Sequence, residues 1–309
     1  MCCFSAKTEV YETSIFARFL KPGTQALVYQ MRYTAQTPTA MILPLPVALP
    51  AREDGVRFKN LKEYPTFFAD LATGFPEIPK RSLIGSKSAV ATATAPLAVH
   101  DVGDFIATFV PQVKDFGRVD PRFAISKDVW DRIPAYADYG FAVFQLKELS
   151  GEPHPIALEF DTRTRDKLFY PTVHIHDGTV HDKDDFDHVL YAQEATFDGG
   201  AGDYEGPDAV DKRTGFVRSK EKASSFANAA SSQGLVDGNL LVHKTSLRGT
   251  LPNRDTTFDL RAIATRSSGA CSRCDVGPSA GLDGAWLPVT ATLASLGWII
   301  RRRNERSRG

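Results

Sequence analysis

The chain has 309 residues, which is enough for one large domain or two ordinary ones with a full hydrophobic core. Lys and Arg together number 37, as do Asp and Glu, so no net charge draws the chain to nucleic acid, and we expect no nucleic-acid partner. The abundance of Phe (20) over Met (3) favours sheets packed by aromatic side chains over long amphipathic helices.

The first part of the chain is expected to form mainly strands. Two β-rich runs flank Pro22-Gly23 and predict a hairpin over residues 14–33. Residues 40–49 contain two prolines, which cannot donate to a ladder, so this run is expected at a sheet edge or as an extended segment. Apolar residues at helical spacing predict a short helix within 62–74.

The pattern continues through the rest of the chain to about residue 263. Further strands are expected at 97–102, 105–110, 141–149, 156–160, 167–176, 240–247 and 256–263. Short helices are expected within 120–136 and over 219–233, and the Gly- and Asp-rich stretch 194–218 is interpreted as a flexible loop or insert. The sequence therefore predicts a β-dominated α+β fold of antiparallel sheets, built from hairpins with a few short helices.

The composition changes after residue 265, which predicts three regions. Residues 1–265 are expected to form a single β-rich globular domain, and 266–283 a flexible, Cys-containing linker. Residues 284–309 join an apolar segment to a basic tail. The uncharged part of this region would rise about 25 Å as a helix, which is the short limit for spanning a bilayer. Membrane contact through the tail is one interpretation, and an amphipathic or disordered tail is the other.

The two ends of the chain suggest different locations. The start lacks the basic residues and apolar run of a secretory signal, so the N-terminus predicts a cytoplasmic protein. The C-terminal tail instead favours membrane association or export. Four cysteines in a chain of this length do not make a disulfide framework.

A segment with three histidines is the most specific chemical feature of the sequence. The Asp177-Gly178 pair between β-forming residues predicts a hairpin with a two-residue loop. In that register His174 lies opposite His181, and His176 shares their face. Alternation then gathers three imidazoles on one face and leaves an apolar, packed face made of Val173, Ile175 and Val180.

Three imidazoles on adjacent strands can hold zinc, copper or iron, with a fourth position open to water, thiolate or substrate. We therefore predict a metal site with His174, His176 and His181 as ligands, and with a thiolate from Cys2 or Cys3 as a further ligand. Residues that would orient the ring nitrogens, or lie in a solvated acidic loop, are Asp182, Asp184, Asp185, Asp187 and His188.

If the chain is an enzyme, metal-activated water or redox chemistry at this site is the expected mechanism, as in a metal-dependent hydrolase or a redox enzyme. The alternative without a metal is that the histidines simply occupy the polar face of a hairpin. A loop of odd length or a bulge would then separate His181 from the other two.

Two other function classes remain open. Removal of Met1 would make Cys2 an N-terminal nucleophile whose own α-amine acts as base, which predicts an amidohydrolase with Cys2 as its catalytic residue. The chain could equally be a non-catalytic scaffold or surface protein. Cys271 and Cys274 have half of a zinc-ribbon spacing without a second half. Nucleotide-binding and serine-hydrolase motifs are absent, which argues against nucleotide-dependent chemistry.

The first 75 residues resemble a family of bacterial β-rich proteins of unknown function. The resemblance rests on the Cys2-Cys3 start, the IFAR segment at 15–18 and the AMILPLPV segment at 40–47. Many members of that family are exported with the cysteine at the mature N-terminus, and the family implies no activity. The tail is similar to the myxobacterial C-terminal sorting signal, in which a Cys precedes an apolar segment and an Arg cluster; this likeness implies export.

Overall fold

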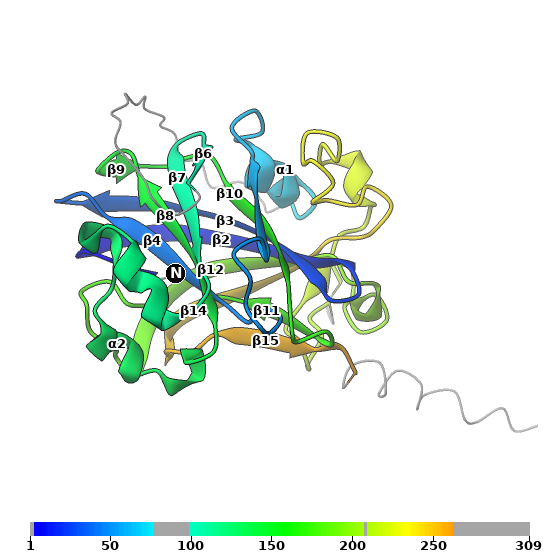
Figure 1. Cartoon of the computed structure of the whole chain (residues 1–309). Coiled ribbons are helices and arrows are strands. Elements are labelled where there is room, and N and C mark those ends of the chain that lie inside the picture. Colours follow the sequence, from blue (N-terminus) through cyan, green and yellow to red (C-terminus); the bar gives the residue numbers. More distant parts are fainter. Residues whose placement is uncertain (1–2, 77–98, 207–208, 262–309) are drawn as a thin grey trace, which may run out of the picture. The chain divides into compact units, whose positions relative to one another are not determined.

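The structure is a computed structural model that describes residues 3–76, 99–206 and 209–261 (Figure 1). Cys2, the expected linker at 266–283 and the expected tail at 284–309 lie outside the described residues. The described residues all belong to one compact unit, Met1–Ala270. Among them, no helix has both the length and the apolar character needed to cross a bilayer.

The larger sheet is built on the long hairpin of β2 (Thr8–Lys21) and β3 (Thr24–Ala35), which confirms the hairpin predicted around Pro22-Gly23. Gly23 turns the chain with a φ of 82°, a conformation that glycine adopts without strain. Its other strands are β5 (Val56–Asn60), β9 (Ser150–Gly151), β10 (Ile156–Asp161), β12 (Lys183–Ala192), β13 (Val217–Arg218) and β14 (His243–Pro252). Their order is β13-β14-β12-β2-β3-β10-β5, with β9 beside β3, and β12 runs parallel to β2.

The smaller sheet has the order β1-β4-β8-β7-β6. Its strands are β1 (Cys3–Phe4), β4 (Ala40–Leu45), β6 (His100–Val102), β7 (Phe105–Val110) and β8 (Gly140–Leu146). The short strand β1 pairs only with Met41 and Ile42 of β4. Pro44 lies beyond the end of β1, so the absence of its amide proton costs no hydrogen bond to β1. A separate antiparallel pair joins β11 (Lys167–Tyr170) to β15 (Thr256–Asp259).

Alternate side chains of the two sheets meet in one apolar core. Ile15, Leu27 and Leu190 enter it from the larger sheet, and Leu43 and Phe144 from the smaller one. The outer face of each sheet is covered by a second cluster of buried side chains, one of which contains Trp130 and the other Phe67. His188 lies two residues from Leu190 on β12, so its side chain points toward the space between the sheets.

The helices are short, as expected. Those of the described residues are α1 (Phe67–Thr73) and α2 (Lys127–Asp131), with 3-10 helices η1 (Val113–Arg118), η2 (Pro121–Phe123), η3 (Pro134–Tyr136), η4 (Ala195–Phe197) and η5 (Ala223–Ser225). The predicted β-dominated α+β fold of antiparallel sheets with few short helices is confirmed.

The expectation of a helix over 219–233 is wrong, because this segment forms only η5 and turns. Its Ser side chains bond to the local backbone instead. Ser219 Oγ donates to the Glu221 carbonyl at 2.7 Å, and Ser232 Oγ donates to that of Ala229 at 2.6 Å. Such bonds compete with helical ones.

The stretch 194–218, which its Gly and Asp content predicted to be a flexible loop or insert, contributes side chains to the core near both of its ends. Phe197 and Phe216 are fully buried in the core between the sheets, and their rings stack with centroids 5.0 Å apart. Each buried aromatic ring removes a large apolar area from water, which outweighs the conformational freedom of the neighbouring glycines.

Candidate functional site

The segment around Asp177 and Gly178 turns as predicted, but its two arms do not form the expected ladder. Gly178 has a φ of 78°, and the Thr179 amide donates to Asp177 Oδ1 at 2.9 Å. Of the residues in these arms, only Ile175 forms a β-bridge, and its partner is Cys3. The prediction that His174 pairs directly with His181 is therefore wrong.

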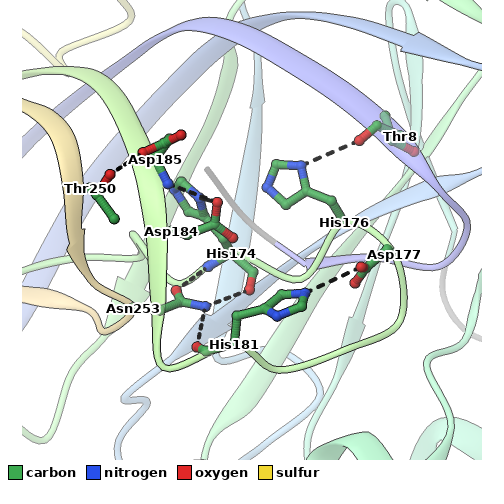
Figure 2. Close-up of polar contacts among 9 residues, drawn as sticks. All are labelled: Thr8, His174, His176, Asp177, His181, Asp184, Asp185, Thr250 and Asn253. Carbon is green, nitrogen blue, oxygen red and sulfur yellow. Dashed lines mark hydrogen bonds and ion pairs between the residues drawn. The ribbon is translucent and has the colours of Figure 1, made fainter.

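Asn253, in the turn between β14 and β15, takes the place of that ladder (Figure 2). Its Nδ2 donates to the carbonyls of both His174 and His181, at 2.9 and 3.1 Å, and its Oδ1 accepts from the His174 amide at 2.7 Å. The arms of the turn thus face each other across an amide side chain that comes from far along the sequence. The residues of the turn themselves give no sign of this arrangement, because the side chain that joins the two arms belongs to a distant segment.

The apolar face of the segment is as the alternation predicts. Val173 and Ile175 are buried, and Val180 packs against the same cluster. Cys3 belongs to this cluster too, whereas its neighbour Phe4 points into the core between the sheets and lies near the His176 ring. Since successive side chains of a strand point to opposite faces, the Cys3 thiol lies on the side away from the imidazoles. The structure does not bring Cys3 to the histidines, and Cys2 lies outside the described residues.

His181 also lies apart from the other two histidines. Its side chain is half exposed, and its Nε2 lies 3.2 Å from Asp177 Oδ2. Figure 2 shows the His181 ring directed toward Asp177, which is itself exposed. His181 is thus a partner of an exposed carboxylate, and not a neighbour of the buried His174 ring.

The third imidazole near His174 is His188 of β12. The His174 ring centroid lies 5.1 Å from that of His176 and 5.2 Å from that of His188. The Phe186 ring is tilted against both, with its centroid 4.2 Å from that of His174 and 5.1 Å from that of His188. We call His174, His176 and His188 the histidine cluster. It sits where the 174–176 segment crosses the inner face of β12.

Sequence reasoning assigned His188 only an orienting role, although a signal for its position was present. Phe186, His188 and Leu190 stand at every second position, after the polar Asp185 and Asp187, which is the alternation expected for one inward face of a strand. An imidazole at an apolar position of such a pattern is buried, and its nitrogens then require partners.

The nitrogens of the histidine cluster are largely without partners. His174 and His188 are completely buried, and neither nitrogen of either ring has a hydrogen-bond partner among the described residues. His176 is half-buried; its Nδ1 lies 3.3 Å from the Thr8 carbonyl, and its Nε2 has no partner. A carbonyl at Nδ1 holds the proton there and leaves the lone pair on Nε2, which is the form that binds metals.

Burial also favours the neutral form of His174 and His176. Burial lowers the pKa of His174 to about 2, and it also lowers the pKa of His176. The nearest carboxylate is that of Asp184, whose Oδ1 lies 3.5 Å from His174 Nδ1. Within the described residues, no three His, Cys, Asp or Glu side chains are already placed as the ligands of one metal ion.

The cluster borders a polar hollow of about 400 Å³. Its lining residues are Lys7, Thr8, His176, Asp177, His181, Lys183 and Asp184. The exposed side chains of Asp177 and His181 line the hollow, together with the half-buried ring of His176. Solvent therefore reaches the edge of the cluster at His176 and Asp184.

A buried carboxylate fixes the backbone just before His174. Asp255 Oδ1 accepts from the amides of Thr172 and Val173 at 2.9 and 3.2 Å, and its Oδ2 accepts from the Tyr136 hydroxyl at 2.6 Å. Burial raises the pKa of Asp255 to about 6, although these hydrogen bonds act in the opposite direction. The segment that carries His174 and His176 is thus anchored by Asp255 on one side and by Asn253 on the other.

No family model and no curated protein matches this sequence. Among solved structures, the crystal structure of baculovirus P35 is similar, with a TM-score of 0.44 and 15% identity over 84% of this chain and 99% of that one. A mutated baculovirus P35 after caspase cleavage has a TM-score of 0.41 and 15% identity over 80% and 99% of the two chains. P35 in its complex with caspase-8 has a TM-score of 0.40 and 14% identity over 81% and 96%. Similarity at this level carries no inference about activity or partners.

Proposed function

We propose that this chain is a metal-binding β-rich protein, and that His174, His176 and His188 hold the ion with Asp184 beside it. The observation that carries the proposal is the pair of fully buried rings, His174 and His188, whose four nitrogens lack hydrogen-bond partners among the described residues. An unsatisfied buried polar group costs about 1–3 kcal/mol, so several together mark a place where a ligand is expected.

The spacing of the rings supports the same proposal. Imidazole nitrogens bind zinc at about 2.0–2.1 Å, so the centroids of two rings on one tetrahedral ion lie about 5 Å apart. The His174 centroid has this separation from both other rings of the cluster, at 5.1 Å from His176 and 5.2 Å from His188. Binding of one ion would require the rings to turn about their own side-chain bonds, because no three such side chains of the described residues are already placed around one point.

The ligand types narrow the choice of metal. Neutral imidazoles with one carboxylate suit zinc, copper or iron, whereas magnesium and calcium prefer sites built from oxygen atoms. Asp184 lies on the hollow and next to His174, so it is available as a fourth ligand or as a base for a metal-bound water. The proposed ligand set keeps His174 and His176 from the set predicted from sequence. It has His188 and Asp184 in place of His181, Cys2 and Cys3.

Metal content tests this proposal. Untagged protein is purified, reconstituted with zinc, desalted and analysed by mass spectrometry. We expect about one equivalent in the wild type and almost none in His188→Phe or His176→Ala. The second variant removes a half-buried ring, so it keeps the test valid if loss of the buried ring impairs folding.

His243→Phe is the matched control. His243 is also fully buried, but it contacts Phe197 and lies 2.9 Å from Asp198. His188 pairs with Leu247 on β14, four residues beyond His243 along that strand, or about 13 Å away. We expect this control to retain the metal. A wild type that binds no zinc, copper or iron would overturn the proposal.

A further inference from the structure

The hollow beside the histidine cluster contains two lysines without ionic partners. Lys7 precedes β2 and Lys183 begins β12, and both are exposed. Neither ammonium group makes a hydrogen bond or an ion pair with any residue that the structure describes, although both line the same hollow as His176 and Asp184. Two unpaired cations at one opening are typical of a site for an anion.

The acidic residues of the neighbourhood divide between two faces. Strand alternation places Asp184 toward the hollow and Asp185 on the other face, where its Oδ1 accepts from the Thr250 hydroxyl at 2.6 Å (Figure 2). Asp177 is the other carboxylate that lines the hollow. The carboxylates of Asp177 and Asp184 therefore match the two lysines in number, so the Lys and Asp side chains that line the hollow sum to zero charge.

A divalent ion in the histidine cluster would change this balance. Two lysines and two carboxylates sum to zero, so an added metal ion leaves the site with two net positive charges. Three imidazoles leave at least one coordination position for a further ligand, and the ligand can enter only where the cluster meets solvent, at His176 and Asp184. An anion in the hollow could bind the metal with one oxygen and the lysines with the others.

We propose that the hollow binds a small oxyanion, a phosphate or carboxylate group, between Lys7, Lys183 and the metal held by the histidine cluster. This inference rests on the proposed metal site. It makes anion binding conditional on the metal, because the Lys and Asp side chains that line the metal-free hollow cancel one another in charge. A hollow of about 400 Å³ is large enough for a small organic molecule that carries the anionic group.

Calorimetric titration of the full chain with inorganic phosphate, and separately with acetate, tests the inference. Zinc-loaded, desalted protein is compared with protein stripped by a chelator, and metal content is measured on every sample. We expect binding of at least one of the two anions to the zinc-loaded protein and none to the stripped protein. Phosphate alone would indicate a phosphate-bearing ligand, and acetate alone a carboxylate.

Lysine variants separate this inference from the metal site itself. We expect Lys7→Gln/Lys183→Gln to weaken anion binding at least tenfold while zinc content stays at the wild-type value. Lys62→Gln, an exposed lysine after β5 at the other edge of the larger sheet, should bind as the wild type does.

Zinc-loaded wild type that binds neither anion, or a double variant that binds as tightly as wild type, would overturn the anion site and leave the metal site standing. Equal binding by stripped protein would overturn the coupling to the metal. A wild type that binds no zinc, copper or iron would instead refute the metal site, and the anion site with it.

Discussion

The rings of His174 and His188 lie 5.2 Å apart between two sheets, and none of their four nitrogens has a hydrogen-bond partner among the described residues. One ring comes from an irregular segment and the other from the inner face of β12. Buried polar atoms are nearly always satisfied in folded proteins. A metal ion shared by these rings would satisfy one nitrogen of each, and it would do so with the neutral form of the imidazoles.

Zinc should stabilise the wild type against unfolding, and it should not stabilise His188→Phe. A ligand that binds only the folded state adds about 2.7 kcal/mol when its concentration is 100 times its dissociation constant. Thermal melts with zinc and with a chelator measure this difference. In the metal-free state we expect His188→Phe to lie within about 1 kcal/mol of the wild type, since an apolar ring replaces two unsatisfied nitrogens beside Phe186. A zinc-induced shift in this variant equal to that of wild type would refute the role of His188.

Asn253→Ala should destabilise the protein by about 1–3 kcal/mol and weaken zinc binding. The Asn253 side chain makes three hydrogen bonds to the backbone of His174 and His181, and its loss leaves those groups unpaired. Chemical unfolding and zinc titration measure the two effects. Asn239→Ala, at an exposed position, is the matched control and should change neither quantity. Wild-type zinc affinity in Asn253→Ala would show that this anchor does not position the ligands.

Asp255 should make metal-free stability depend on pH. Burial raises its pKa from 3.8 to about 6, so the folded state holds the proton more tightly than the unfolded state does. Its contribution is therefore fully present below about pH 3.8 and is lost as pH rises through about 6, by up to about 3 kcal/mol.

Asp255→Asn lacks this titration, so the comparison of the two proteins isolates it. The stability of wild type relative to Asp255→Asn should fall between pH 4 and pH 7, which urea unfolding at a series of pH values measures. A difference that stays constant across this range would show that the Asp255 carboxyl does not have a raised pKa.

Phe216→Ala should cost about 3–5 kcal/mol of stability, because Phe216 is fully buried and stacks on Phe197. Val210→Ala is the control from the same stretch of chain; Val210 is 57% exposed, and its truncation should change stability by less than about 0.5 kcal/mol. Equal, small effects of the two substitutions would mean that residues 194–218 are not packed into the core.

Local patterns predicted the elements whose structure is set by neighbouring residues. The β2–β3 hairpin follows from alternation and from a Pro-Gly turn, and α1 follows from apolar residues at helical spacing. The same kind of reasoning wrongly predicted a helix over 219–233, because the serines of this segment bond to the local backbone. In the Gly- and Asp-rich stretch, the glycine and aspartate content gave no indication that Phe197 and Phe216 are buried in the core.

The candidate site was predicted in part, for a physical reason. Alternation correctly separated Val173 and Ile175 from the imidazoles, and it placed His174 and His176 on one face. The position of His181 depended on direct pairing of two arms, which the distant residue Asn253 replaces. His188 joins the cluster through β12, whose position beside the 174–176 segment depends on tertiary packing. Contacts of this kind are not encoded in the spacing of neighbouring residues.

A crystal of the zinc-loaded protein, with anomalous diffraction measured at the zinc absorption edge, tests the metal site most directly. We predict one strong peak at about 2.0–2.1 Å from a nitrogen of each of His174, His176 and His188, with Asp184 next to it. A peak at His181 or at the Cys271 and Cys274 thiols, or an ordered water at the centre of the cluster in its place, would contradict the assignment.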